Sequence, residues 1–288
     1  MSGAGFLATL LLVPAAAGAQ TIPTVDTEDA SLGSLAVGRG RLHPILGVDL
    51  RNGDFARGGY DDDAANLDRL PVHVQLGLAF DLHRDASGEA DWWLVGSSSN
   101  GFHAPSPDER TRPRAWYESN NLVALVGKPA RGLTVGAAYT IKTSPNGVAG
   151  TSHEASLTAA FEGTRGIGLL HPGAAVTVRP KGDGGVFTQV SIEPEVALRS
   201  GDDAPSLSLP VIAGVGWSGF YGPGTGDVAY GSAGVAYSHP FVIGNGHWRL
   251  RAEALAVVRD PTLRRLGSLD AETSRVVPLA TVALTFSY

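Results

Sequence analysis

Apolar residues in this chain alternate with polar or small residues over stretches of about a dozen positions. The clearest stretch has Val72, Val74, Leu76, Leu78, Phe80 and Leu82 interleaved with His73, Gln75, Gly77, Ala79, Asp81 and His83. A period of two places successive side chains on opposite faces of a β-strand. The alternation returns at 133–141, 207–217 and 282–288, and no helical period competes with it. The pattern predicts an all-β protein whose strands have two different faces.

Turn signals divide the chain into about twelve strands of roughly 8–13 residues, close to the length that crosses a bilayer at a tilt. The predicted spans are 43–51, 72–83, 91–101, 116–127, 133–142, 153–161, 173–179, 186–196, 206–217, 228–241, 247–258 and 275–288. Connections after odd-numbered strands are mostly long and several after even-numbered strands are tight, as in outer-membrane barrels. We therefore predict an antiparallel transmembrane β-barrel of about 12 strands over residues 43–288.

The first 42 residues do not follow this pattern. Residues 1–19 have a short apolar core, a break at Pro14 and the small residues Ala17-Gly18-Ala19 before Gln20. These features predict a secretory signal peptide, although the usual positive residues at its start are absent. Residues 20–42 are polar and turn-rich, which predicts a flexible or plug-like segment.

Composition narrows the class of protein further. The 288 residues include no Cys and carry a net charge of −6, so no disulfide framework is available and no cationic surface for nucleic acid is indicated. After the first twenty positions there is no apolar run of 18 residues, which argues against a helical membrane protein. A large hydrogen-bonded sheet is the remaining source of stability.

Charged and polar residues inside the predicted strands indicate which face is inward. A charge on the lipid face costs about 2–4 kcal/mol at the bilayer midplane, so these residues are expected to face the lumen. The predicted lumen-lining residues are Asp49, Arg51, His73, Asp81, Lys142, Glu154, Gln189, Glu193, Glu195, Arg249, Arg251 and Glu253. The strands therefore predict a polar interior of mixed sign.

Aromatic residues near the strand ends fit the girdles that barrels place at the membrane interfaces. They are Trp92, Trp93, Trp116, Tyr117, Trp217, Tyr237, Phe241, Trp248, Phe286 and Tyr288.

Several segments resemble a known family of barrels. They are Trp116-Tyr117-Glu118-Ser119, Leu133-Thr134-Val135-Gly136, Tyr139-Thr140, Thr143-Ser144-Pro145-Asn146, Gly150-Thr151, His153-Glu154, Leu207-Ser208-Leu209-Pro210 and Leu284-Thr285-Phe286-Ser287-Tyr288. From Trp116 onward the chain is similar to TorF-type bacterial porins and related outer-membrane barrels, whereas the first third departs from them. The resemblance implies a Gram-negative outer membrane, with lipid and lipopolysaccharide as surroundings. It also implies that the barrel-assembly machinery reads the C-terminal strand with its final aromatic residue.

Few residues suggest chemistry. Barrel-embedded lipid hydrolases often carry His-x-Ser-Asn, but Tyr117 and Ser97 stand where Ser119 and Ser99 would need the histidine. His153 or His239 could reach them only from another strand. Asp61-Asp62-Asp63 could bridge a cation to lipopolysaccharide, although a solvated loop tip is the preferred interpretation. The histidines show no metal-ligand spacing and no cofactor motif occurs, so we predict no enzyme, no metal and no cofactor.

The predicted function is a passive small-solute channel in the bacterial outer membrane, because the inner face is polar. A structural or binding barrel without transport is the alternative, and a lipid hydrolase is a more distant one. Twelve strands lie between filled eight-stranded barrels and open sixteen-stranded porins, so strand number alone leaves the lumen open or plugged.

Overall fold

The computed structural model describes most of the chain outside its first 19 residues. The described ranges are 20–53, 55–60, 70–85, 88–105, 111–147, 149–163, 166–181, 184–201, 203–266 and 274–288. The predicted signal peptide at 1–19 and the acidic run Asp61-Asp62-Asp63 lie outside them.

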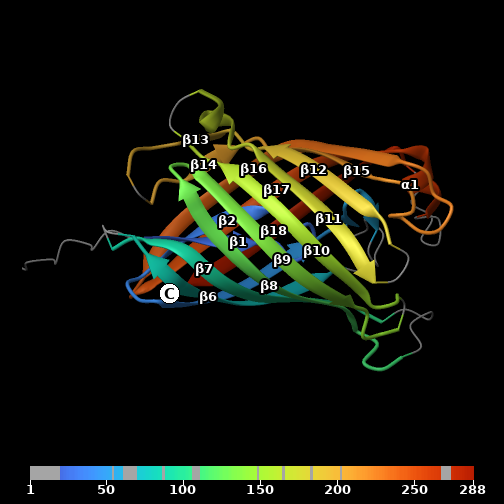
Figure 1. Ribbon diagram of the computed structural model, residues 1–288, viewed down its shortest axis with the longest axis horizontal. Helices are drawn as coiled ribbons and strands as arrows, with labels where there is room; N and C mark the ends of the chain where they lie inside the picture. Colours follow the sequence, from blue (N-terminus) through green and yellow to red (C-terminus); the bar gives the residue numbers. More distant parts are fainter. Residues whose placement is uncertain are drawn as a thin grey trace, which may run out of the picture.

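One antiparallel sheet closes on itself to form a barrel (Figure 1). Twelve wall strands follow one another in chain order, and the last pairs with the first through Thr281 to Ser287 of β18. The wall consists of β3 (Leu42–Arg51), β6 (Val72–Arg84), β7 (Ala90–Phe102), β8 (Trp116–Ala130), β9 (Leu133–Thr143), β10 (Ser152–Phe161), β11 (Gly173–Lys181), β12 (Val186–Ile192) with β13 (Glu195–Ala197), β14 (Ser206–Ser208) with β15 (Val211–Gly216), β16 (Val228–Ile243), β17 (Gly246–Arg259) and β18 (Val276–Ser287). The predicted fold class and strand number are confirmed.

Two wall strands are interrupted at prolines. Pro194 separates β12 from β13, and Pro210 separates β14 from β15. Proline has no backbone N–H to give to a ladder, but its carbonyl still accepts, from the N–H of Leu209 for Pro194 and of Gly234 for Pro210. The barrel therefore stays closed across both breaks.

The outer face of the wall is a continuous apolar surface. Alternate residues such as Leu76, Val123 and Val190 are 50%, 51% and 59% exposed. A soluble protein does not expose such a surface around its whole circumference, because its contact with water would be too costly. The surface fits the hydrocarbon layer of a membrane, and the protein is a membrane-spanning β-barrel.

Residues 20–37 form a hairpin inside the barrel, made of β1 (Gln20–Val25) and β2 (Leu32–Val37) (Figure 1). We call it the lumen hairpin. The near rim is the end where β3 begins and β18 ends, and the far rim is the opposite end. A 3-10 turn, η1 (Gly166–Leu170), lies at the near rim. The small hairpin β4 (Phe55–Ala56) and β5 (Gly59–Tyr60) and helix α1 (Pro261–Leu266) follow strands that end at the far rim.

Among the described residues, no helix is long and apolar enough to cross a membrane.

The aromatic prediction needs two corrections. Trp93 and Tyr117 are 1% and 2% exposed and point into the barrel instead of joining a girdle. By contrast, Phe241 stacks on Trp248, and Trp248 packs against Phe286. These rings lie on the outer face close to the near rim, as an interfacial girdle requires.

Candidate functional site

The lumen hairpin packs against one side of the barrel interior. Its side chains Ile22, Val25, Leu35 and Val37 are at most 8% exposed. They form one apolar cluster with inward residues of β6–β9, which are Ala79, Trp93, Val95, Leu122, Ala124, Val126 and Ala138. We call this side of the barrel, which the hairpin covers, the covered wall. The polar interior expected from the sequence therefore describes only part of the lumen.

Polar contacts fix the turn of the lumen hairpin deep inside the barrel. Arg51 Nη1 donates to Glu28 Oε1 at 2.6 Å, and Lys142 Nζ donates to the carbonyl oxygen of Glu28 at 2.7 Å. Gln189 Nε2 donates to Asp29 Oδ2 at 2.9 Å. These donors come from widely separated strands, so the turn is tied to both sides of the lumen.

The turn between β4 and β5 packs against the wall at the far end of the lumen. Arg57 in this turn is 7% exposed and donates to both carboxylate oxygens of Glu154, at 2.7 and 2.8 Å. Tyr221 donates to the carbonyl oxygen of Arg57 at 2.7 Å. The next residue, Gly58, has φ +76°, and a Cβ there would lie 2.5 Å from Tyr230, so glycine is required. We call the Arg57–Glu154 pair the far clasp.

Other cations and an aromatic ring surround the far clasp. Arg179 Nε lies 3.2 Å from Glu154 and Lys142 Nζ lies 3.8 Å from it. The guanidinium groups of Arg57 and Arg179 lie 5.3 and 4.0 Å from the ring centroid of Phe220. Burial alone would lower the pKa of Arg57, but the Glu154 carboxylate outweighs it and raises that pKa above its ordinary value. Arg57 therefore stays charged and paired.

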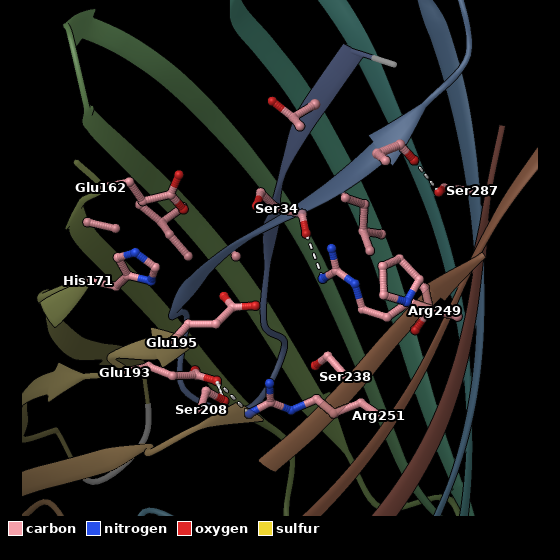
Figure 2. A pocket seen from close by; sticks show the side chains of 18 of the residues that line it. Ser34, Glu162, His171, Glu193, Glu195, Ser208, Ser238, Arg249, Arg251 and Ser287 are labelled. Atoms are coloured by element: carbon pink, nitrogen blue, oxygen red, sulfur yellow. Dashed lines mark hydrogen bonds and ion pairs between the residues drawn. The ribbon is translucent and has the colours of Figure 1, made fainter. Parts of the chain in front are cut away.

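A cavity of about 1040 Å³ lies between β2 and the wall from β10 to β18, and we call it the vestibule (Figure 2). It reaches the near rim, where His171 and Asn245 line it. Its lining contains the serines Ser31, Ser34, Ser191, Ser206, Ser208, Ser238 and Ser287. We call this side of the barrel the open wall, because polar side chains there face unfilled space.

Charges of both signs line the vestibule. Arg251 Nη2 lies 2.8 Å from Glu193 and 2.6 Å from Glu253, so its charge is largely compensated. Arg249 Nη1 donates to the carbonyl oxygen of Ser34 on the lumen hairpin at 2.9 Å (Figure 2).

The structure places the twelve predicted lumen residues in three areas. Gln189, Glu193, Glu195, Arg249 and Arg251 line the vestibule, with Glu253 paired to Arg251. Asp49, Arg51, His73, Lys142 and Glu154 belong to the network around the hairpin turn and the far clasp. Asp81 lies toward the near rim, where its carboxylate is 3.4 Å from His43 and also bonds to Arg84. All are buried or half-buried except Glu195.

Sequence reasoning missed the role of Tyr117. An irregularity in the pairing of β7 with β8 makes Tyr117 an extra residue and turns it inward. Its hydroxyl lies 2.7 Å from His73 Nε2, and His73 Nδ1 lies 3.2 Å from Asp49. The ring covers Gly101, where a Cβ would lie 2.5 Å from Tyr117 Cζ. The adjacent aromatics Trp116 and Tyr117, which break the alternation, were the available signal.

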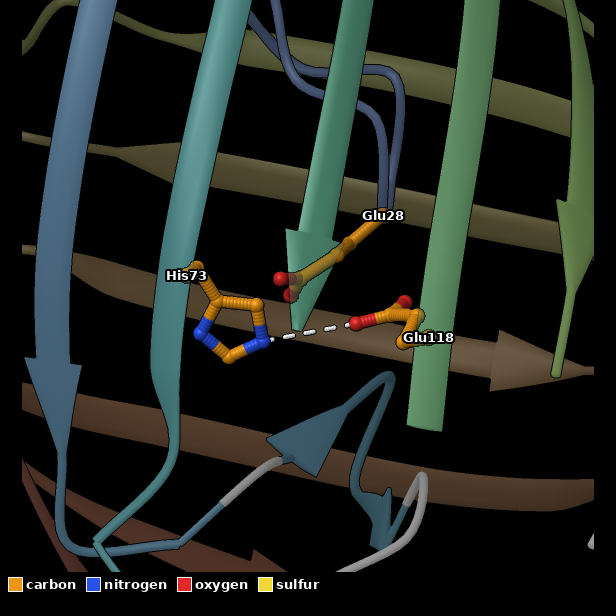
Figure 3. A group of neighbouring side chains, drawn as sticks. All are labelled: Glu28, His73 and Glu118. Carbon is orange, nitrogen blue, oxygen red and sulfur yellow. Dashed lines mark ion pairs between the residues drawn. The ribbon is translucent and has the colours of Figure 1, made fainter. Parts of the chain in front are cut away.

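One group of side chains resembles a metal-binding cluster (Figure 3). Its ligand atoms lie within 4.8 Å of one another and belong to Glu28, His73 and Glu118. Each already bonds to the protein: Arg51 to Glu28, Tyr117 to His73 and Asn120 to Glu118. Because the arginine charge would also repel a cation, we assign no metal site to this cluster.

Within the described ranges, the serines considered for a hydrolase meet no base. Asn121 Nδ2 donates to Ser119 Oγ at 3.1 Å, and Ser99 Oγ is buried without a hydrogen-bond partner among the described residues. His153 bonds to the hydroxyl of Tyr139, and His239 stacks with Tyr237 and Phe241. Neither histidine activates either serine in this arrangement.

No protein-family model matches the sequence, and no curated protein sequence matches it. Among solved structures, the chain is similar to the KdgM porin, with 11% identity and a TM-score of 0.44 over 85% of this chain and 99% of that one. It is also similar to the translocator domain of the autotransporter NalP from Neisseria meningitidis, with 9% identity and a TM-score of 0.44 over 87% and 89%. OprB of Pseudomonas putida gives 10% identity and a TM-score of 0.39 over 86% and 94%.

Proposed function

We propose that this outer-membrane barrel is a passive small-solute channel whose pathway runs through the vestibule, beside the lumen hairpin. The observation that carries the proposal is the vestibule of about 1040 Å³ inside a membrane barrel, lined by serines and by charges of both signs. That volume is at the upper end of the range for small-molecule pockets, so a small solute and its water fit. The resemblance to TorF-type porins agrees with this function. In the proposal the near rim faces the periplasm and the outer surface contacts lipid and lipopolysaccharide.

In this proposal the lumen hairpin is a fixed part of the pore wall. Moving it out would expose Ile22, Val25, Leu35 and Val37, which are all buried. At about 1.5–3 kcal/mol for each side chain, their exposure costs roughly 6–12 kcal/mol before any polar contact is broken. Thermal motion does not supply that energy at a useful frequency, so the pathway opens elsewhere.

The far clasp is the gate in this proposal. The β4–β5 turn is short, and its polar contacts with the wall are the Arg57–Glu154 pair and the Tyr221 hydrogen bond. Its packing contacts are those of Gly58 with Tyr230 and of Arg57 with Phe220. Opening the far clasp moves the β4–β5 turn and leaves the apolar cluster between the lumen hairpin and the covered wall intact. The same closure favours the second candidate, a structural or binding barrel without transport. We propose no enzymatic activity, because neither candidate serine has a base in the part of the chain that the structure describes.

Planar-bilayer recording on the refolded protein tests the channel. We expect low open probability in the wild type and at least a tenfold increase in Arg57→Gln, since hydrogen bonds between charged groups contribute about 1.5–3 kcal/mol. Arg199→Gln is the matched control, because Arg199 is exposed at the near rim and donates to the carbonyl of Asp203 at 3.2 Å.

The barrel fold is checked in every sample by heat-modifiable gel mobility. If the folded wild type, Arg57→Gln and a variant without residues 20–37 all fail to conduct, the channel is rejected and the structural candidate replaces it.

A further inference from the structure

The strand β2 has an unpaired backbone edge. The N–H of Asp26 donates to the carbonyl of Ser31 at 2.9 Å, which makes these two residues a hydrogen-bonded pair of the hairpin. Hydrogen-bonded and non-hydrogen-bonded pairs alternate along an antiparallel ladder. Ser34 and Ala36, opposite Pro23 and Thr21, are therefore in pairs whose peptide groups point away from β1.

The wall caps the acceptors of this edge and leaves its donors. Arg249 Nη1 donates to the carbonyl of Ser34 at 2.9 Å, and Ser287 Oγ donates to the carbonyl of Ala36 at 2.6 Å. The N–H groups of Ser34 and Ala36 point in the same direction as these carbonyls. In the described part of the chain, neither N–H has an acceptor. Each carbonyl of the edge therefore already accepts one hydrogen bond, whereas its two N–H groups are unused among the described residues.

These donors are accessible from the vestibule. Ser34, Ala36 and Arg249 all line it and are half-buried. Arg249 uses one guanidinium nitrogen for Ser34, so further N–H groups remain for a ligand. Figure 2 shows Glu195 on the other side of the cavity, and this carboxylate interacts electrostatically with Arg249.

We propose that Arg249 and the donor edge of β2 together bind the carboxylate of a short monocarboxylate solute. The proposal rests on the proposed channel, because it names the class of solute that the vestibule takes. A carboxylate has acceptors only and matches a site whose unused groups are the two N–H donors of β2 and the guanidinium of Arg249. A peptide added as a β-strand would also need the carbonyls that Arg249 and Ser287 already occupy. A ligand with a second carboxylate long enough to cross the vestibule would meet Glu195.

Binding of lactate and of lactamide to the detergent-solubilised protein is the test, measured by ligand-observed NMR. The two probes have nearly the same shape, but lactamide has no charge and presents N–H donors to a donor site. We expect lactamide to bind at least tenfold more weakly than lactate, and Arg249→Gln to lose a similar factor for lactate. Arg199→Gln leaves lactate affinity unchanged. Equal binding of the two probes overturns the proposal.

A second pair of variants isolates the backbone donor. Ser34→Pro removes the N–H of residue 34, and Pro23 in the opposite strand shows that this type of edge position accepts proline. Ser34→Ala keeps the N–H and is the control. We expect lactate affinity to fall several-fold in Ser34→Pro and to stay unchanged in Ser34→Ala. Wild-type affinity in a folded Ser34→Pro protein overturns the role of the edge. If that variant does not fold, the Arg249→Gln result decides.

The binding assay separates this site from the channel itself. A barrel that conducts but binds lactate and lactamide equally refutes the carboxylate site and leaves the channel. A barrel that binds lactate selectively but never conducts supports the site and refutes transport.

Discussion

The covered wall and the open wall have the same outer face and opposite inner faces. Outward residues are apolar on both, as at Leu125 and Val190. Inward residues are apolar on the covered wall, as at Leu122 and Val126, and polar on the open wall, as at Ser238 and Gln189. The apolar residues at every second position of the strands indicate the membrane around the barrel. The composition of the inner face indicates what lies next to it in the lumen. Where that face is apolar it contacts the hairpin, and where it is polar it borders unfilled space.

The largest expected effect comes from placing a polar side chain on the apolar inner face of the covered wall. Leu122→Asp places a carboxylate in the apolar cluster with the lumen hairpin, where Leu122 is 5% exposed. We expect the free energy of unfolding to fall by about 3 kcal/mol or more. Ser238→Asp makes the equivalent change beside the vestibule and is expected to cost less than about 1 kcal/mol. Urea titrations followed by heat-modifiable mobility compare the two. Equal losses would contradict the distinction between the walls.

A smaller effect is expected at two glycines of one strand in the covered wall. Gly101→Ala pushes a methyl group into the ring of Tyr117, whereas the Cβ of Gly96→Ala meets nothing within 4 Å. We expect Gly101→Ala to destabilise the barrel by about 1–3 kcal/mol, because the ring must leave His73. Gly96→Ala should change stability by no more than about 0.5 kcal/mol. The same urea titration measures both, and a harmless Gly101→Ala would mean that the inward position of Tyr117 is wrong.

The twelve wall strands could be predicted because each has to satisfy lipid on one face, which imposes a strict period of two. The content of the lumen could not, since residues 20–37 are short, polar in part and without a clear period. The inner faces of β7 and β8 carried the missing signal, because Val95, Ala124 and Val126 are apolar at positions where a wet lumen would select polar residues. The inward position of Tyr117 could not be predicted for another reason. One extra residue in β8 reverses, from that point on, which residues face inward and which face outward.

The charge of the open wall should set the ion preference of whatever current flows. The vestibule is lined by the acids Asp29, Glu162, Glu193, Glu195 and Asp203 and by the arginines Arg39, Arg249 and Arg251. Replacing Arg249 and Arg251 by Gln removes two positive charges and releases Glu193 from its ion pair. The remaining field is then acidic, and the selectivity should move toward cations.

Reversal potentials in a salt gradient measure this shift, with Arg57→Gln as the conducting background and Arg199→Gln added as the control. The shift should be larger at low ionic strength, because charges are screened within about 8 Å at physiological salt. The expected effect is the smallest of the three, since Arg251 is already compensated by Glu193 and Glu253. An unchanged reversal potential at low salt would mean that current bypasses the vestibule, and the open wall would then no longer be the wall of the pore.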